Sequence, residues 1–191
     1  MQQNTLSHMG WGLWANLTRR IGPGRIPQKA FDAFCGAFVT NSVNLIPIGV
    51  DGFGEAEVLL IWREDEYCHG WHFPGKILLP GQTSEGTLDE TIETELGPDA
   101  KVEILSLLGV FDIMKGTGVG ESPRGQEVSQ VYIGLVRFVE DIAPDDGEWE
   151  WFPLDDLSRD LIDEQRPHLE AARVWVRNNQ ARLQEEDPIF Q

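Results

Sequence analysis

The alternation of apolar and polar positions divides the chain into extended runs and helical stretches. Four runs rich in Val, Ile, Leu and aromatic residues have the length and composition of strands, at 36–50, 56–63, 101–114 and 129–139. The run at 56–63 is almost continuously apolar, which is typical of a strand covered on both faces. Because strands and helices alternate in the pattern, we expect an α/β fold with a mixed sheet between helices.

The helical stretches are expected at about 84–96 and 167–184. In the second, apolar residues recur at helical spacing and predict packing against the core: Leu169, Ala172, Val176 and Leu183. A shorter helix is expected at 9–20, and the sequence "GPGRIP" breaks it before a brief helical turn that opens with Pro27. We therefore expect an N-terminal helical extension, 1–34, and one domain, 35–191, that includes the C-terminal helix.

Charge excludes one class of partner. The formal charge is −17, from 32 acidic and 15 basic residues, so the chain is not expected to bind nucleic acid through its phosphates. Four bases gather near the start and form either an anion-facing patch or the solvated end of a helix: Arg19, Arg20, Arg25 and Lys29.

Compartment and membrane contacts follow from what the sequence lacks. Cys35 and Cys68 show no metal-ligand spacing and are expected to be free thiols in a reducing compartment. The N-terminus has no apolar stretch of signal-peptide length, and no 18-residue apolar run predicts a membrane helix. These observations favour a cytoplasmic protein with no membrane partner.

The helix at 84–96 is rich in acids, and its geometry separates them. It ends at "GP", a strong stop signal. Successive residues of a helix are turned by about 100°, so Glu95 is expected to share its face with Leu88, Thr91 and Thr94. Three acids point the other way and are expected to face water: Asp89, Glu90 and Glu93. Glu95 is therefore the acid that turns toward the protein.

A carboxylate on a half-apolar face costs several kcal/mol unless a cation or hydrogen bonds compensate it. Glu95 therefore needs a partner. It could bind Mg²⁺, which prefers oxygen ligands. It could also pair with an internal Arg or Lys, or accept hydrogen bonds from backbone amides. Helix geometry alone leaves these alternatives open.

With these residues the chain resembles the Nudix hydrolases. That family carries the Nudix box, G-x5-E-x7-R-E-U-x-E-E-x-G-U, where U is apolar, usually preceded by Trp and then Pro-Gly-Gly. The sequence "WHFPGK" supplies Trp71, Pro74 and Gly75, and "ELG" supplies Glu95 and Gly97, at the family's distance. The resemblance covers about 38–157 and implies an α/β/α sandwich around a mixed sheet.

The box also departs from the family pattern. Lys76 replaces its first Gly, Gln82 its early Glu, and Glu90-Thr91 its Arg-Glu pair. In the family, acids at the positions of Thr91, Thr94 and Glu95 bind the metals, so two of the three are missing. A register shifted by one residue would recover acids at Glu90 and Glu93, but it would misplace Pro74 and Gly97.

This pattern is most similar to the GDP-mannose glycosyl hydrolase branch, which keeps only the final acid of the helix and binds one Mg²⁺. There the metal is held by that acid, by a backbone carbonyl at the Pro-Gly-Gly turn, and by a Gln in a later loop, beside a His that acts as base. Here these positions correspond to Glu95, Gly75, Asp145 and Asp146. The branch's diphosphate-contacting Arg corresponds, with one gap, to Arg63.

The resemblance thus implies a hydrolase that uses Mg²⁺, or Mn²⁺ as a substitute, on a nucleoside diphosphate linked to another moiety such as a sugar. Glu95, Gly75 and Asp145 would hold the metal, and Asp145 or Asp146 would activate water. Arg63 would hold phosphate oxygens, and Lys76 or Arg124 are further candidates for the same role. The alternative is a catalytically weak or inactive domain that binds a nucleotide or a protein. A homodimer contact through the C-terminal helix is also left open.

Overall fold

The computed structural model describes residues 28–51, 53–65, 68–114, 125–137, 142–143, 148–157 and 161–186. Its strands are β1 Thr40–Val50, β2 Ala56–Glu64, β3 His69–His72, β4 Gly75–Ile77, β5 Val102–Ile113, β6 Glu127–Val136 and β7 Trp149–Pro153. Its helices are α2 Gln28–Ala37, α3 Ser84–Thr91, the π-helix η1 Ile92–Leu96, the 3₁₀ turn η3 Asp163–Gln165 and α4 Arg166–Glu186.

The strands form one mixed sheet. Its order is β3-β2-β1-β6-β5, and two short strands lie off this path, with β4 paired to β1 and β7 to β2. β1 and β6 are parallel from Thr40–Glu127 to Ile48–Leu135, whereas the other pairs are antiparallel. The predicted α/β class with a mixed sheet is confirmed.

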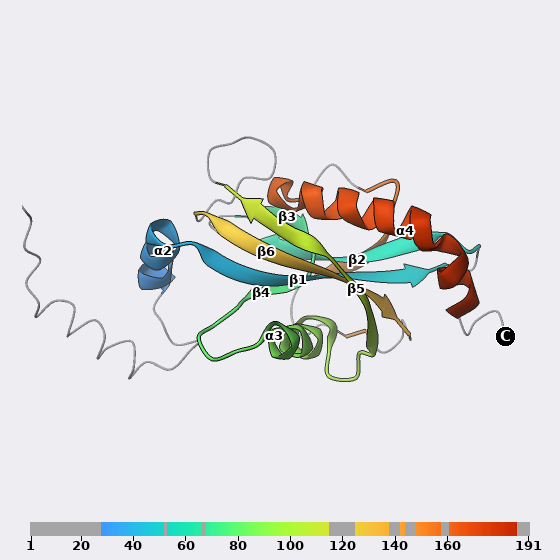
Figure 1. The fold of residues 1–191 in the computed structure, drawn as a ribbon, viewed down its shortest axis with the longest axis horizontal. Coiled ribbons are helices and arrows are strands. Elements are labelled where there is room, and N and C mark those ends of the chain that lie inside the picture. Colours follow the sequence, from blue (N-terminus) through green and yellow to red (C-terminus); the bar gives the residue numbers. More distant parts are fainter. Residues whose placement is uncertain are drawn as a thin grey trace, which may run out of the picture.

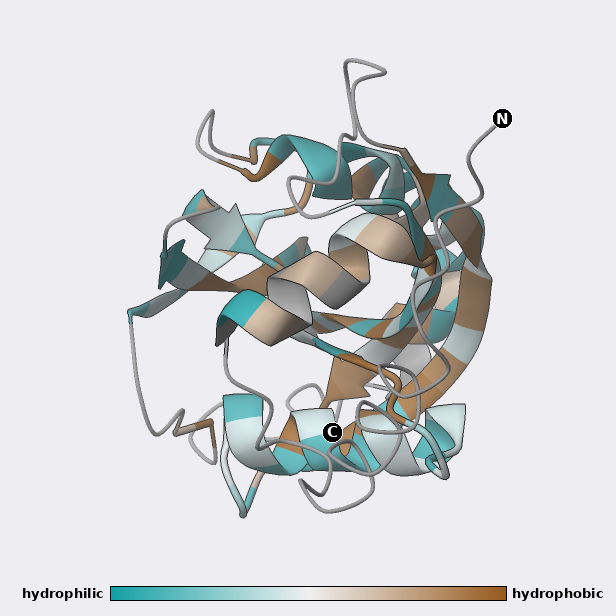
Figure 2. Cartoon of the chain, turned by 90° about the vertical axis from the view of Figure 1, so that its left-hand side faces the viewer, coloured by the Kyte–Doolittle hydropathy of each residue, from teal (hydrophilic) through white to brown (hydrophobic). Residues whose placement is uncertain are grey.

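Helices cover both faces of this sheet (Figure 1). On one face α4 covers a core that includes Ile46, Ile48 and Ile133. On the other face α3 and η1 cover a second core that includes Val43, Leu45 and Leu96. Figure 2 shows the strands as a largely hydrophobic layer between α3 and α4. The predicted α/β/α layering is therefore confirmed.

The predicted apolar positions of α4 are all buried, at no more than 8% exposure: Leu169, Ala172, Val176 and Leu183. The helix expected at 9–20 lies outside the described residues. The brief turn expected after Pro27 is a ten-residue helix, α2. No helix in the described ranges is both long and apolar enough to cross a membrane.

The helix predicted at 84–96 forms, but in two parts. Thr83 caps α3, because its hydroxyl accepts a hydrogen bond from the Gly86 amide at 3.1 Å. The last turn, η1, widens into a π-helix. It ends at Gly97, where φ is 112° and a Cβ atom would lie 2.8 Å from the Ala143 carbonyl oxygen. A side chain at this position would be strained in both respects.

Candidate functional site

The turn between β3 and β4 presents its backbone to the helix. The Leu45 amide donates to the Pro74 carbonyl at 2.9 Å, and Gly75 pairs with Asn44 across β1 and β4. A Cβ atom on Gly75 would lie 2.2 Å from Oδ1 of Asn44. Only glycine therefore allows the turn to approach β1 this closely.

A buried polar network holds Asn44 beneath the turn. Its Nδ2 donates to the hydroxyl oxygens of Ser42, at 2.9 Å, and Ser129, at 2.7 Å. All three side chains are at most 7% exposed. The amide therefore has both of its hydrogens engaged, and its Oδ1 is fixed toward Gly75. Sequence reasoning missed this network, although polar residues at alternating positions of an otherwise apolar strand were a signal.

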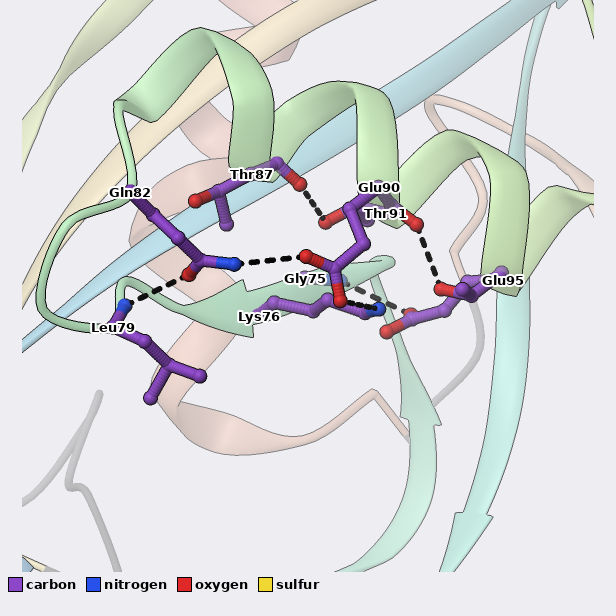
Figure 3. A network of polar contacts seen from close by, with 9 residues as sticks. Gly75, Lys76, Leu79, Gln82, Thr87, Glu90, Thr91 and Glu95 are labelled. Atoms are coloured by element: carbon purple, nitrogen blue, oxygen red, sulfur yellow. Dashed lines mark hydrogen bonds and ion pairs between the residues drawn. The ribbon is translucent and has the colours of Figure 1, made fainter. Parts of the chain in front are cut away.

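Glu95 meets the same turn from the helix side. Its Oε2 accepts a hydrogen bond from the Gly75 amide at 3.1 Å (Figure 3). Burial raises the pKa of Glu95 to about 7, and the Gly75 hydrogen bond and the charges of Lys76 and Arg63 oppose this rise. In the part of the chain that the structure describes, Glu95 has no ion-pair partner. Of the alternatives considered for Glu95, the backbone amide is the one observed.

The other acids of the helix are exposed, as predicted: Asp89, Glu90 and Glu93. Thr91 is fully buried, and its hydroxyl donates to the Thr87 carbonyl at 2.8 Å. Thr94 was expected to share the inner face with Glu95, and that expectation is wrong: its side chain is exposed and donates to the Glu90 carbonyl at 2.8 Å. In a regular helix Thr94 points about 100° away from Glu95, which places it at the margin of the inner face. The π-helical last turn then changes the direction of its side chain further.

Three of the departures from the Nudix box contact one another. Nζ of Lys76 pairs with Oε1 of Glu90 at 2.9 Å, and Nε2 of Gln82 donates to Oε2 of Glu90, also at 2.9 Å. Oε1 of Gln82 in turn accepts from the Leu79 amide at 2.9 Å. Lys76 lowers the pKa of Glu90 through a hydrogen bond and through its charge. Figure 3 shows these residues linking the loop and β4 to the helix. The substitutions therefore form one compensated network.

Arg63 lies at the end of β2, within electrostatic reach of Glu95. Its guanidinium pairs with Asp65 at 2.7 Å and remains 30% exposed. His72 lies nearby and is partly buried, and desolvation of its ring lowers its pKa to about 4. The ring is therefore neutral, and its Nδ1 donates to the Phe73 carbonyl at 2.8 Å. The structure thus brings Glu95, Gly75, Lys76 and Arg63 together.

The remaining predicted site residues lie outside the described part of the chain: Arg124, Asp145 and Asp146. The segments that flank the two aspartates are described, and both are attached beside the site. The Ala143 amide donates to the Leu96 carbonyl at 2.8 Å, next to Glu95. The Trp62 amide donates to the Glu148 carbonyl at 2.7 Å, next to Arg63.

The described atoms test whether a divalent cation fits here. Glu95 is partly buried, it ionises less readily than an ordinary carboxyl, and it has no ion-pair partner among the described residues, so a cation suits it as a counter-charge. It is a single carboxylate, because the described residues contain no cluster of three or more His, Cys, Asp or Glu. Further oxygen ligands must come from the backbone, from water or substrate, or from residues outside the described ranges.

Several solved structures share this fold. A possible asymmetric diadenosine tetraphosphate (Ap4A) hydrolase from Jonesia denitrificans has a TM-score of 0.63 and 24% identity, with 76% of this chain and 97% of that chain covered. The NUDIX domain of Shewanella oneidensis NrtR, in complex with ADP ribose, has a TM-score of 0.53 and 19% identity, covering 73% and 91%. A Caenorhabditis elegans Ap4A hydrolase has a TM-score of 0.53 and 14% identity, covering 73% and 99%.

No curated protein matches the chain. The NUDIX domain family model matches residues 42–177, a range that contains the Pro-Gly turn, the helix with Glu95 and most of α4. Its similarity to the GDP-mannose branch stays a prediction. The match covers more than half of the sequence and agrees with the sheet and helix arrangement, and the chain therefore belongs to the NUDIX domain family.

Proposed function

We propose that this protein is a Mg²⁺-dependent hydrolase, able to use Mn²⁺, whose substrate is a nucleoside diphosphate linked to another moiety, a nucleotide sugar among the candidates. The single observation that carries the proposal is Glu95. Its carboxylate is partly buried against the Gly75 amide, its pKa is raised to about 7, and two cations act on it without pairing to it. Such a group is costly to the fold, and a bound cation offsets that cost.

The relatives support the substrate class. Two of the structures with this fold carry the names of Ap4A hydrolases, and a third contains ADP ribose. Both molecules join two groups through a chain of phosphates. A phosphate chain placed beside Glu95 would meet the positive charges of Arg63 and Lys76.

In this proposal the residues divide the work. Glu95, the Gly75 carbonyl and Asp145 would hold the cation, which would supply positive charge beside the phosphates when bound. Arg63 and Lys76 would orient phosphate oxygens, and Arg124 would add a third contact. Asp145 or Asp146 accepts the proton of the attacking water. The attachment of 142–143 beside Glu95 and of 148–149 beside Arg63 supports this role for the short loop between them.

A second candidate function is binding without turnover. Two positions at which the family uses metal-binding acids carry Thr91 and Thr94, and both hydroxyls are engaged by helix carbonyls. Lys76 is also occupied by Glu90. A domain that recognises a nucleotide in this state would use Arg63 and would need no metal.

The deciding experiment is a substrate panel with two readouts. Nucleoside diphosphate sugars, dinucleoside polyphosphates, ADP ribose and nucleoside triphosphates are incubated with Mg²⁺ or Mn²⁺, and products are identified by mass spectrometry. Binding of the same compounds is measured by calorimetry without metal. Turnover that disappears in Glu95→Gln and persists in Glu93→Gln supports the hydrolase. Tight metal-independent binding with no turnover on any compound supports the second candidate and sinks the first.

A further inference from the structure

The apolar residues of β5 recur every third position, although a regular strand repeats every second. The pairing of β5 with β6 shifts register twice, between Ile104 and Ser106 and between Leu107 and Gly109. Each shift is a bulge that inserts one residue. One apolar set therefore faces the α4 side and packs against the core there: Leu105, Leu108 and Phe111.

The second set, which we call the β5 strip, consists of Ile104, Leu107 and Val110. Their cross-strand partners place the strip on the α3 side of the sheet, since Tyr132 opposite Leu107 packs against the α3-side core. The three side chains are nevertheless 39%, 48% and 60% exposed. β5 is apolar on both faces, as strands covered on both faces are, yet no described element covers the strip.

β5 is also the edge of the sheet and runs along its near side in Figure 1. A long apolar edge strand is normally blocked by charge or covered. An occupant of this edge should therefore match the strip in both apolar character and charge.

Acids outnumber bases at the two ends of the strip. Asp112 is exposed beyond one end of it. At the other end lies a groove of about 550 Å³ between η1 and the start of β5. Its lining holds three acids, Asp89, Glu93 and Glu103, and two bases, Lys101 and Arg137, of which Arg137 pairs with Glu103. A second copy of this acidic chain would bring like charges together here. A basic, apolar segment is the better match.

Residues 1–27 have this composition. They contain three arginines and no acidic residue, so the formal charge of −17 divides into +3 on this segment and −20 on the rest. Their apolar residues fall at helical spacing: Trp11, Leu13, Trp14 and Leu17. No other stretch of this length in the chain lacks acids.

The segment can reach the strip. It joins α2, which leads into β1 at Thr40, and Thr40 pairs with Glu127, the partner of Ile113 at the end of β5. The chain therefore enters the sheet at the end nearest Val110. Extended chain spans about 3.3 Å per residue, so the 14 residues from Trp14 to Gln28 reach up to about 46 Å, longer than the 12-residue strand at about 40 Å.

We infer that residues 11–17 of the same chain dock on the β5 strip, with Trp11 and Trp14 against Leu107 and Val110 and the arginines toward the acids around it. The segment thus covers the exposed edge of the sheet. This inference does not depend on the proposed hydrolase activity.

Disulfide cross-linking in the full chain tests the inference. Ala15→Cys is combined with Leu107→Cys, or with Val110→Cys in a second variant. The matched control combines Ala15→Cys with Val174→Cys, because Val174 is equally apolar and 50% exposed but lies on α4. The native thiols are at most 6% exposed and react slowly. Circular dichroism confirms that each variant is folded.

We expect intramolecular cross-linking to the strip at least tenfold faster than to Val174, and slower cross-linking once Arg19→Glu and Arg20→Glu are added or 1 M NaCl screens the charges. Equal rates at the strip and at Val174 would overturn the inference. So would the absence of a cross-link in both strip variants, a cross-link that joins two copies, or a rate that charge reversal does not change.

Discussion

At the scale of single residues, the raised pKa of Glu95 links its ionisation to the stability of the fold. Its pKa is raised from 4.5 to about 7, so the folded protein binds this proton more tightly than the unfolded chain does. Ionisation therefore lowers the free energy of unfolding as pH rises from about 4.5 to 7, by up to about 3 kcal/mol. A residue that the fold would be more stable without is a sign of functional selection rather than of packing.

Glu95→Gln tests this trade. The Gln side chain can still accept a hydrogen bond from the Gly75 amide, and it carries no charge. Without divalent metal at pH 8, we expect the free energy of unfolding to rise by about 2–3 kcal/mol, and the gain to vanish near pH 5. Urea unfolding measures both. Glu93→Gln, at an exposed position of the same turn, is the control and should change stability by less than about 0.5 kcal/mol.

Added Mg²⁺ should reverse the order of the two proteins. Metal that binds only the folded wild-type protein raises its free energy of unfolding by an amount that grows with the ratio of the Mg²⁺ concentration to Kd. Glu95→Gln is expected to show no such gain. A variant that gains nothing at pH 8, or that is stabilised by Mg²⁺ as much as the wild type, would contradict the assignment of Glu95 as an uncompensated metal ligand.

A single substitution can also distinguish two roles of Lys76, pairing with Glu90 and binding phosphate. Its ammonium pairs with Glu90, and the two side chains are 25% and 45% exposed. Glu90→Gln should change stability by less than about 1 kcal/mol, as exposed pairs do. If Lys76 also binds phosphate, its release should lower the Kd or KM for a diphosphate by roughly two- to fivefold, the equivalent of about 0.5–1 kcal/mol. Calorimetry or steady-state kinetics will measure the affinity of Glu90→Gln for the diphosphate. Glu93→Gln is the control and should leave this affinity unchanged.

At the scale of elements, the pairing of β4 with β1 sets the position of the Gly75 backbone. Gly75→Ala places a Cβ 2.2 Å from Oδ1 of Asn44, and we expect a loss of about 1–3 kcal/mol as the strands move apart. Asn44→Ala leaves the buried Ser42 and Ser129 hydroxyls without their donor, at a cost of about 1–3 kcal/mol. The double variant should be more stable than the sum of the two losses predicts, because removing the Asn44 amide group makes room for the new methyl group on β4.

A double-mutant cycle by urea unfolding measures this coupling, which we expect to exceed about 0.5 kcal/mol. Strict additivity would contradict the proposed contact. Metal affinity provides the functional readout. Gly75→Ala should move the backbone amide that donates a hydrogen bond to Glu95, and it should therefore weaken Mg²⁺ or Mn²⁺ binding. Ser106→Ala, at a distant position on β5, is expected to change neither quantity.

Elements were predictable from the sequence where local periodicity decides them. The strand runs, the stop at Gly97 and the buried face of α4 all follow from spacing and from turn chemistry. The direction of Thr94 was wrong, because whether a helix widens into a π-turn depends on what packs against it. The links of Lys76 and Gln82 to Glu90 were not foreseen, because they require β4 to lie along α3.

The residues of the candidate site were likewise predictable only where a local pattern identifies them. Helix geometry and the family resemblance singled out Glu95 and Gly75, which the structure brings within hydrogen-bonding distance. The contribution of Asn44 comes from strand pairing between residues 31 positions apart, which a single sequence does not encode in any local pattern. The roles expected of Asp145 and Asp146 remain predictions.

At the scale of the whole molecule, buried titratable groups set how stability depends on pH. His168, at the start of α4, is 2% exposed, contacts the Phe111 ring, and has no hydrogen-bond partner at either nitrogen among the described residues. Burial lowers its pKa to about 4, and the pKa of His72 is lowered to about 4 as well. Two histidines that resist protonation act against one carboxyl, Glu95, that resists ionisation.

The sign follows from which state binds the proton. Between about pH 6.5 and 4 the unfolded chain protonates its histidines while the folded protein keeps His72 and His168 neutral, so acid favours unfolding. Each histidine can remove up to about 3 kcal/mol across this window. Glu95 opposes them by a similar amount between pH 7 and 4.5, so the free energy of unfolding should fall by a net of about 3 kcal/mol from pH 6.5 to pH 4.

His168→Leu isolates one of these contributions. Leu suits the apolar surroundings of Phe111 and removes two buried nitrogens that have no partner in the described part of the chain, so stability at pH 7 should rise by about 1–3 kcal/mol. The loss between pH 6.5 and 4 should shrink by about 3 kcal/mol, which nearly flattens the profile. Urea unfolding at half-unit pH steps measures both effects, with His69→Leu, whose side chain is 68% exposed, as the control. An unchanged slope would mean that His168 takes up a proton in the folded protein as readily as in the unfolded chain. The acid sensitivity of the whole molecule would then have to arise elsewhere.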